Sequence, residues 1–221
     1  MKLSDLLKGI PESEYKMQNA EGKSHKSDPR HIEVAGIVHD SRKVKPGFLF
    51  AAIEGVKQDG HLYLELAQKA GASVALVGRP TPLPFPAVIQ TTDVRKLLSI
   101  MAKHFHGDPS SALTTIALTG TKGKTTSVLL MTSVLNAAGR KAGWIGTLGA
   151  QLNGSDHPKK WTLENTTPEG DDFLGILADF VKEGAKAAAF EASSHALALN
   201  KLAGVSLDAA IFTNLSQDHL D

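Results

Sequence analysis

Cysteine is absent from the 221 residues of this chain. Its absence excludes a disulfide scaffold, a thiolate metal site and a cysteine nucleophile, and it fits a reducing compartment. An excess of charge of one sign is also lacking, because 24 lysines and arginines balance 23 aspartates and glutamates. A net charge of +1 therefore offers no electrostatic argument for nucleic acid or an anionic membrane as a partner.

Long apolar runs are missing as well. No segment reaches the length of about 18 apolar residues that a membrane span requires. Near the N-terminus, Asp5, Lys8 and Glu12 stand where a signal peptide needs an apolar core. We therefore expect a cytoplasmic protein with no membrane span. The content of 42% hydrophobic and 21% charged residues is that of a folded globular chain.

Strand-like and helix-like segments alternate along the chain, and this alternation predicts the α/β fold class. The stretch 107–111 contains glycine, aspartate, proline and two serines, and it is the best candidate for a domain boundary. We expect a small α/β domain in residues 1–107 and part of a second, mostly parallel sheet domain in residues 108–221. With about four strands expected there, the second sheet would leave an open apolar edge for self-association or a partner.

The local patterns place the elements as follows. Residues 11–31 are polar, with Pro11 and Pro29, and predict a loop. Residues 151–161 are polar around Asn153-Gly154, which is typical of a hairpin or flap. Helices are predicted over residues 2–9, 61–70, 94–105, 124–138, 168–183 and 195–202, and strands over 32–39, 48–53, 73–77, 87–91, 115–118, 142–145, 185–190 and 209–213.

A glycine-containing loop follows the predicted strand 115–118 and precedes the predicted helix 124–138. Its sequence is Gly120-Thr121-Lys122-Gly123-Lys124-Thr125-Thr126. Such a loop can turn tightly and point backbone N–H groups at phosphate oxygens, next to the positive end of a helix dipole. Lys124 can reach the β- and γ-phosphates, and the Thr125 hydroxyl can bind Mg²⁺. The loop is two residues shorter than the common G-x-x-x-x-G-K-[ST] pattern, which would need glycine at Leu118; a glycine-rich turn with a solvated lysine is the alternative.

Polar residues also follow the last two predicted strands. Glu191 follows strand 185–190, and Asn214, Asp218 and His219 follow strand 209–213. Parallel strands bind ligands at their carboxyl ends, and a carboxylate beside a phosphate loop suits a hard cation. We therefore expect Glu191 and His219 in a metal–phosphate site. Taken alone, Glu191 could be a capping or solvated carboxylate, and His219 a surface residue.

The run Asn165-Thr166-Thr167-Pro168-Glu169 precedes the predicted helix 168–183. A capping interpretation makes Thr167 the N-cap, Pro168 the first helical residue and Glu169 a favourable charge at the helix N-terminus. This interpretation leaves Asn165 and Thr166 unexplained.

Four motifs resemble those of the Mur ligases, most closely the MurE type, which adds the third peptide residue to a peptidoglycan precursor. They occupy residues 119–126, 165–169, 191–197 and 212–221, in the order of that family. Segments 40–47 and 59–61 look like the family's nucleotide-sugar domain, so the resemblance spans essentially the whole chain. It implies ATP-dependent amide formation, in which a substrate carboxylate attacks the γ-phosphate and an amine then displaces phosphate from the acyl phosphate.

The resemblance also implies roles for individual residues. Lys124, Glu191 and His219 form the catalytic set, with Lys124 and Thr125 on ATP and its Mg²⁺ and with Glu191 and His219 on a second Mg²⁺. Lys201 stands near the place where many members grip the substrate with an arginine, and a lysine lacks that bidentate fork. The ligand UDP-N-acetylmuramoyl-dipeptide would meet Ser41, Val56, Lys57, Gln58 and Asp59 at its uridine part, and Asn165, Thr166, Thr167 and Ser193 at its muramoyl-peptide part.

By the same resemblance, a complete ligase holds a carbamoylated lysine, the rest of the central sheet and a C-terminal domain after the His219 motif. We therefore predict that these 221 residues have no ligase activity by themselves. Two other hypotheses stay open at this point. One is a naturally short homologue that binds the UDP-muramoyl precursor in a regulatory or scaffolding role; the other is an unrelated P-loop NTPase. A folate-polyglutamate ligase would share the phosphate loop but not the Asp40-Ser41-Arg42 segment.

Overall fold

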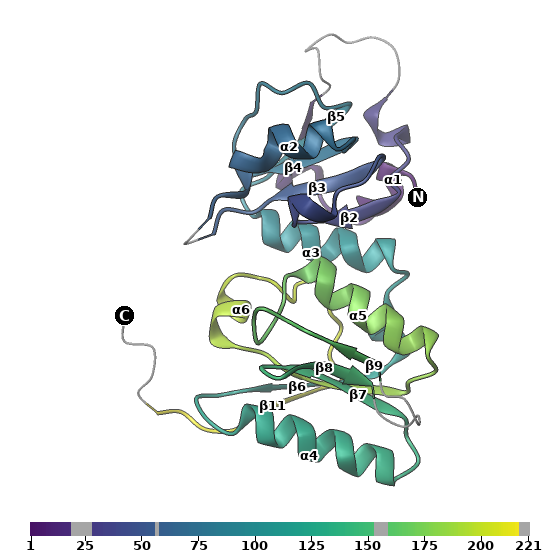
Figure 1. Ribbon diagram of the computed structural model, residues 1–221, viewed down its shortest axis with the longest axis vertical. Coiled ribbons are helices and arrows are strands. Elements are labelled where there is room, and N and C mark those ends of the chain that lie inside the picture. Colours follow the sequence, from purple (N-terminus) through teal and green to yellow (C-terminus); the bar gives the residue numbers. More distant parts are fainter. Residues whose placement is uncertain (19–27, 56–57, 153–158, 217–221) are drawn as a thin grey trace. The chain divides into compact units, whose positions relative to one another are not determined.

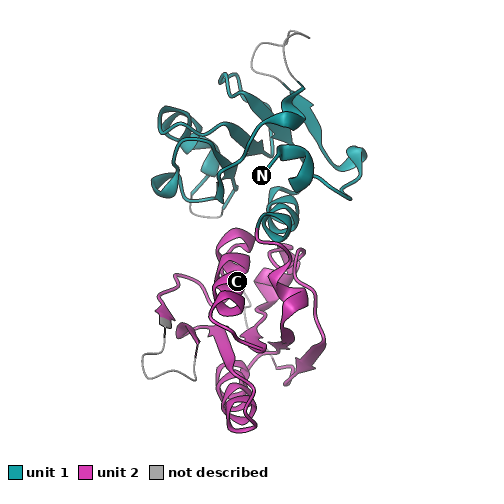
Figure 2. Cartoon of the chain, turned by 90° about the vertical axis from the view of Figure 1, so that its right-hand side faces the viewer, with its two compact units in different colours: residues 1–105 teal, residues 106–221 magenta. Residues whose placement is uncertain are grey.

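The computed structural model describes residues 1–18, 28–55, 58–152 and 159–216. The chain divides into two compact units, Met1–Phe105 and His106–Asp221 (Figure 2). Each unit combines helices with a mostly parallel sheet (Figure 1), which confirms the predicted α/β class. Within the described ranges, no helix has both the length and the apolar character needed to cross a membrane.

The first unit is built on a five-stranded sheet in the order β1-β5-β4-β3-β2. Four of its strands are parallel, and β1 pairs antiparallel with β5. The strands are β1 Lys16–Gln18, β2 Gly36–Val38, β3 Phe48–Ala52, β4 Val74–Val77 and β5 Ala87–Gln90. The helices are α1 Leu3–Leu6, α2 Leu64–Lys69 and α3 Val94–Phe105, with short 3₁₀ helices η1 Glu12–Glu14, η2 Pro29–His31, η3 Ser41–Lys43 and η4 Gly60–Tyr63.

Helices cover both faces of this sheet, because its central strands are apolar at successive positions. Leu49 and Leu76 pack with the core formed by α1 and α3. Their neighbours Phe50 and Val77 pack with α2 in a separate core. Successive side chains of a strand point to opposite faces, so a continuous apolar run is typical of a strand buried on both sides.

The second unit is built on a six-stranded sheet in the order β11-β6-β10-β7-β8-β9. The first four strands in that order are parallel, and the β7–β8 and β8–β9 pairs are antiparallel. The strands are β6 Thr114–Thr119, β7 Ala142–Gly146, β8 Gly149–Leu152, β9 Lys159–Trp161, β10 Ala187–Glu191 and β11 Ala209–Phe212. The helices are α4 Lys124–Ala137, α5 Gly170–Lys182 and α6 Ser194–Ala198, preceded by the 3₁₀ helix η5 Pro109–Ala112.

Two long helices cover the opposite faces of the second sheet (Figure 1). Val128 of α4 packs against Ile116 and Trp144 on one face. On the other face, Phe173 of α5 meets Phe190 of β10 edge to face, with ring centroids 4.9 Å apart. The contacts of Val128 fix α4, and hence the loop that precedes it, against the sheet.

Three expectations about the second unit are corrected. The sheet has six described strands instead of about four, because the polar segment after β7 adds β8 and β9; Asn153-Gly154 lies outside the described residues. Helix α5 begins at Gly170 with Glu169 at its N-cap, so Thr167 is not the cap and Pro168 is not the first helical residue. Helix α6 ends at Ala198 instead of residue 202, and the chain soon turns through Asn200, whose φ is 55°.

The first unit departs from expectation where tertiary pairing decides a polar segment. Residues 11–31 were predicted as loop, but β1 forms there because the edge of β5 pairs with it, with Met17 opposite Ile89. The helix predicted over residues 2–9 covers Leu3–Leu6, and Gly9 has a φ of 75° that ends any helical continuation. The helix predicted over residues 61–70 starts as 3₁₀ turn η4.

Strand β11 is one edge of the second sheet among the described residues. Its side chains are more exposed than those of the other parallel strands, and Phe212 is 62% exposed. Self-association or a partner at this edge stays a prediction.

Candidate functional site

The carboxyl ends of the parallel strands of the second unit carry most of the predicted site residues. The strand register places Glu191 of β10 opposite Leu118 of β6, and Phe212 of β11 opposite Thr119. The glycine loop that follows β6 therefore emerges between the ends of β10 and β11. The sheet topology thus brings the phosphate loop, Glu191 and Asn214 together on the side of the sheet where the parallel strands end.

The phosphate loop turns through two glycines in the left-handed region. Gly120 has a φ of 130°, and a Cβ there would lie 2.3 Å from the Thr213 hydroxyl. Gly123 has a φ of 84° and occupies the N-cap of α4 without a side-chain cap. The Nζ of Lys124 donates to the carbonyl oxygens of Gly120 and Thr121 at 2.6 and 3.2 Å. The loop is thus folded over its lysine, with the uncapped N-terminus of α4 beside it.

The segment after β11 braces this loop by a reciprocal amide contact. Asn214 Oδ1 accepts from the Lys122 N–H at 3.0 Å, and Asn214 Nδ2 donates to the Lys122 carbonyl at 3.0 Å. The Asn214 carbonyl accepts from Thr121 N–H, and the Thr213 hydroxyl donates to the Lys122 carbonyl at 2.8 Å. Asn214 therefore fixes a peptide of the loop; Asp218 and His219 lie outside the described residues.

Glu191 is held at the end of β10 by Thr147, a residue that the sequence patterns did not single out. Glu191 is 2% exposed, and its Oε1 accepts from the Thr147 N–H at 2.9 Å. The Thr147 hydroxyl lies 3.3 Å from Glu191 Oε2 and 3.1 Å from the Thr166 hydroxyl. Gly146 leaves room for this carboxylate, because a Cβ there would lie 2.2 Å from Oε1. The position of Thr147 directly after β7 is the signal that could have identified it.

Thr167 joins the segment before α5 to the segment after β10 instead of capping a helix. Its hydroxyl donates to the Glu191 carbonyl at 2.8 Å and accepts from the Ser193 N–H at 3.1 Å. Thr167 is 2% exposed. Ser193 in turn caps α6 by accepting from the Ala196 N–H at 3.2 Å. Asn165 is exposed and Thr166 is half-buried, so both border the same segment from the solvent side.

Lys201 lies beside that bridge in a buried ion pair. Its Nζ is 3.0 Å from Glu169 Oε1, and the two side chains are 10% and 11% exposed. The same Nζ lies 3.5 Å from the Thr167 carbonyl oxygen. The structure therefore brings Thr167, Ser193 and Lys201 together, with Glu169 as a partner that the sequence patterns assigned to the helix dipole.

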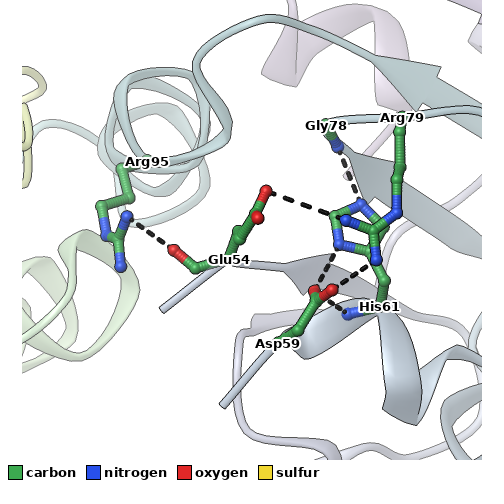
Figure 3. A network of polar contacts seen from close by, with 6 residues as sticks. All are labelled: Glu54, Asp59, His61, Gly78, Arg79 and Arg95. Carbon is green, nitrogen blue, oxygen red and sulfur yellow. Dashed lines mark hydrogen bonds and ion pairs between the residues drawn. The ribbon is translucent and has the colours of Figure 1, made fainter. Parts of the chain in front are cut away.

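In the first unit, Asp59 is the centre of a polar network at the carboxyl ends of β3 and β4 (Figure 3). Its Oδ1 accepts from the His61 N–H at 2.9 Å and contacts His61 Nδ1 at 2.7 Å, and Arg79 pairs with Oδ2. The Gly78 N–H donates to His61 Nε2 at 3.2 Å, so Nδ1 carries the proton and donates to Asp59. Burial raises the pKa of Asp59, but the hydrogen bonds from His61 and Arg79 outweigh it and lower the pKa to about 2.

Two of the other predicted uridine contacts, Ser41 and Gln58, are among the described residues. Ser41 follows β2 and begins η3, whose N-cap is Asp40. The side-chain hydrogen bond from Arg42 lowers the pKa of Asp40, although partial burial opposes this shift. Gln58 is exposed next to Asp59, whereas Val56 and Lys57 lie outside the described residues.

The residues at the carboxyl ends of the parallel strands in the second sheet fit a nucleotide phosphate and Mg²⁺. The uncapped first turn of α4 offers N–H groups to an anion, and a carboxylate with a threonine hydroxyl offers the hard oxygen donors that Mg²⁺ prefers. Within the described part of the chain, no cluster of three or more histidine, aspartate or glutamate side chains could hold a metal alone. The assignment of Thr125 to the Mg²⁺ of ATP and of Glu191 to a second Mg²⁺ stays a prediction.

The fold and this site define a two-unit α/β protein with a glycine-containing loop, of the type that binds phosphates, at the carboxyl ends of the parallel strands of its second sheet. A model described as "Mur ligase family, catalytic domain" matches residues 33–106, and one described as "Mur ligase middle domain" matches residues 118–221. The chain belongs to the Mur ligase family and carries its N-terminal and middle domains. The predicted resemblance is confirmed.

Three of the similar proteins carry the same name. The chain is 37% identical over 222 residues to a UDP-N-acetylmuramoyl-L-alanyl-D-glutamate–2,6-diaminopimelate ligase of Caldanaerobacter subterraneus subsp. tengcongensis, covering 100% of this chain and 43% of that protein. A ligase of the same name from Xanthomonas campestris pv. campestris is 43% identical over 195 residues, 87% of this chain and 39% of that protein. A solved structure of a ligase with this name has a TM-score of 0.76 at 27% identity, covering 91% of this chain and 40% of that one. The chain spans about two fifths of the length of the curated relatives it matches.

Proposed function

We propose that this chain forms the precursor-binding part and the phosphate-binding part of a MurE-type ligase. The reaction is the ATP-dependent addition of the third peptide residue to UDP-N-acetylmuramoyl-L-alanyl-D-glutamate in the cytoplasm. One observation carries the proposal: the phosphate loop, Glu191 and the Thr167–Ser193 bridge share one sheet edge in a chain whose relatives are named for this ligase. A reaction that brings a phosphate and a carboxylate together needs two such sites side by side.

The loop after β6 is assigned to the phosphates of ATP. The N–H groups of residues 123–126 and the Lys124 ammonium would bind phosphate oxygens. A hydrogen bond from the ammonium to an anionic oxygen joins two opposite charges, so it is stronger than the bonds that Lys124 donates to loop carbonyls. Thr125 would hold the Mg²⁺ of ATP, and Glu191 would hold a second Mg²⁺, with His219 added by the resemblance. When bound, these cations neutralise charge on the transferred phosphoryl group.

The precursor is assigned to the remaining site residues. Asn165, Thr166 and Ser193 are proposed contacts of the muramoyl peptide, and Thr167 holds their two segments together. In the first unit, Ser41, Val56, Lys57, Gln58 and Asp59 are proposed contacts of the uridine part. Asp59 is fixed by His61 and Arg79, so its carboxylate orders the end of β3 more than it offers a free ligand.

Calorimetry with UDP-N-acetylmuramoyl-L-alanyl-D-glutamate tests the binding part of the proposal. We expect the unmutated chain to bind and Ser41→Ala to bind about tenfold more weakly, as for loss of one buried hydrogen bond. No heat with the unmutated chain would refute the proposal. For the chain alone we expect no ATP-dependent phosphate release with this precursor and an amino acid; release that requires all three would contradict that expectation.

A further inference from the structure

The buried ion pair between Lys201 and Glu169 lies next to the proposed peptide contacts. Both side chains are nearly buried, and Nζ is 3.0 Å from Oε1. Burying two charges is costly, and their attraction repays the cost only when the geometry is good. In some proteins a buried ion pair fixes a conformation more than it adds stability.

The segment next to this ion pair contains Thr167. Lys201 Nζ contacts the Thr167 carbonyl oxygen, and Glu169 lies two residues further along the chain. The Thr167 hydroxyl donates to the Glu191 carbonyl and accepts from Ser193 N–H. A continuous series of polar contacts therefore runs from the Lys201–Glu169 ion pair through Thr167 to Glu191 and to Ser193.

The same contacts oppose a direct role for Lys201 with an acidic ligand. Its ammonium is already paired with a carboxylate, so the pair has no net charge to attract a second one. A ligand carboxylate would have to displace Glu169, leaving a buried charge unpaired, and such a loss is strongly unfavourable.

We propose that Lys201 is a positioning residue: together with Glu169 it holds Thr167 between Glu191 and Ser193, and it does not bind a carboxylate of the precursor. The relevance of this role to catalysis rests on the proposed function. The positioning itself is a property of the chain and can be measured without a ligand.

Amide hydrogen exchange measures the positioning in the full 221-residue chain. We expect Lys201→Met and Glu169→Gln each to speed exchange of the Ser193 N–H, which donates to Thr167, by about tenfold. Lys201→Arg keeps a cation and should restore protection. Lys182→Met removes an exposed lysine from the other end of α5 and serves as the control. Unchanged exchange in Glu169→Gln would overturn the proposal even if Lys201→Met fails to fold.

Calorimetry with two ligands separates positioning from direct contact. The ligands are UDP-N-acetylmuramoyl-L-alanyl-D-glutamate and UDP-N-acetylmuramoyl-L-alanine, which lacks the glutamate. Under the proposal, Lys201→Met and Glu169→Gln weaken both ligands by the same factor. If Lys201→Met weakens the longer ligand alone while Glu169→Gln strengthens it, Lys201 binds the ligand and the proposal is wrong. If the unmutated chain binds neither, the proposed function fails, and hydrogen exchange still decides the positioning.

Discussion

Replacing Asp59 with asparagine removes the charge at the centre of the network in Figure 3. Asparagine keeps a side-chain oxygen that can accept from the His61 N–H and from the His61 ring. It cannot form the ion pair with Arg79, and its amide group would face the guanidinium. The substitution therefore isolates the electrostatic part of the network from its geometry.

The expected magnitude comes from the pKa of Asp59, which falls from 3.8 to about 2. One pKa unit corresponds to about 1.4 kcal/mol, so the ionised carboxylate contributes at most about 2.5 kcal/mol to folding. Arg79 is half exposed, and solvent screening reduces this to about 1–2 kcal/mol. Because the folded pKa is the lower one, the contribution is complete above pH 4 and is lost as the pH falls through 2.

Urea unfolding at several pH values measures this difference. Both tyrosines, Tyr15 and Tyr63, lie in the first unit, and both tryptophans, Trp144 and Trp161, lie in the second. Near-ultraviolet signals of tyrosine therefore report the unit that carries the mutation, while tryptophan fluorescence reports the other. We expect Asp59→Asn to lower the unfolding free energy of the first unit at pH 7 and to match the unmutated chain near pH 2.

A matched control is Glu65→Gln, which removes an exposed carboxylate paired with Lys69 one helical turn away. Exposed pairs of this type contribute little, so we expect no measurable change. A difference between Asp59→Asn and the unmutated chain that stays constant from pH 7 to pH 2, or no difference at pH 7, would refute the electrostatic account of the network.

Three further predictions concern the second unit. Gly146→Ala puts a Cβ 2.2 Å from Glu191 Oε1, and we expect Mg²⁺-dependent binding of an ATP analogue, measured by calorimetry, to weaken about 10-fold or more. Thr147→Val should weaken Mn²⁺ binding in the presence of that analogue, and Thr147→Ser should not, because serine keeps the hydroxyl near Oε2. Asn214→Ala removes two hydrogen bonds to Lys122 and should lower the unfolding free energy by about 1–3 kcal/mol; Ser216→Ala, whose backbone makes the contacts to Thr121, should leave it unchanged.

Local chemistry was sufficient to predict the strand, the glycine-containing loop and the helix from β6 to α4. The strand, the loop and the helix from β6 to α4 were placed within about one residue, because glycine conformations, the helix start and the apolar strand are all decided by neighbouring residues. The strands β3, β4, β5, β7 and β10 were predicted nearly as well, because each is a short apolar run bounded by turn residues.

Local chemistry failed where a distant strand supplied the competing interaction. Thr167 has the residue type and the spacing of an N-cap, yet its hydroxyl binds the Glu191 backbone 24 residues away. The tertiary contact offers Thr167 two partners, a carbonyl and an N–H, where a cap offers one. Strand β1 was not predicted for a similar reason, because its polar sequence pairs with β5, which lies about 70 residues further along the chain.

The sequence by itself determined the α/β class, the glycine-containing loop before α4 and the membership of the Mur ligase family, because these depend on local patterns and on the order of motifs. Only the tertiary structure decided that Thr147 holds Glu191, that Asn214 braces Lys122 and that Lys201 is neutralised by Glu169. Those contacts join segments that are far apart in the chain, and a parallel sheet brings them together only when its strand order and register are formed.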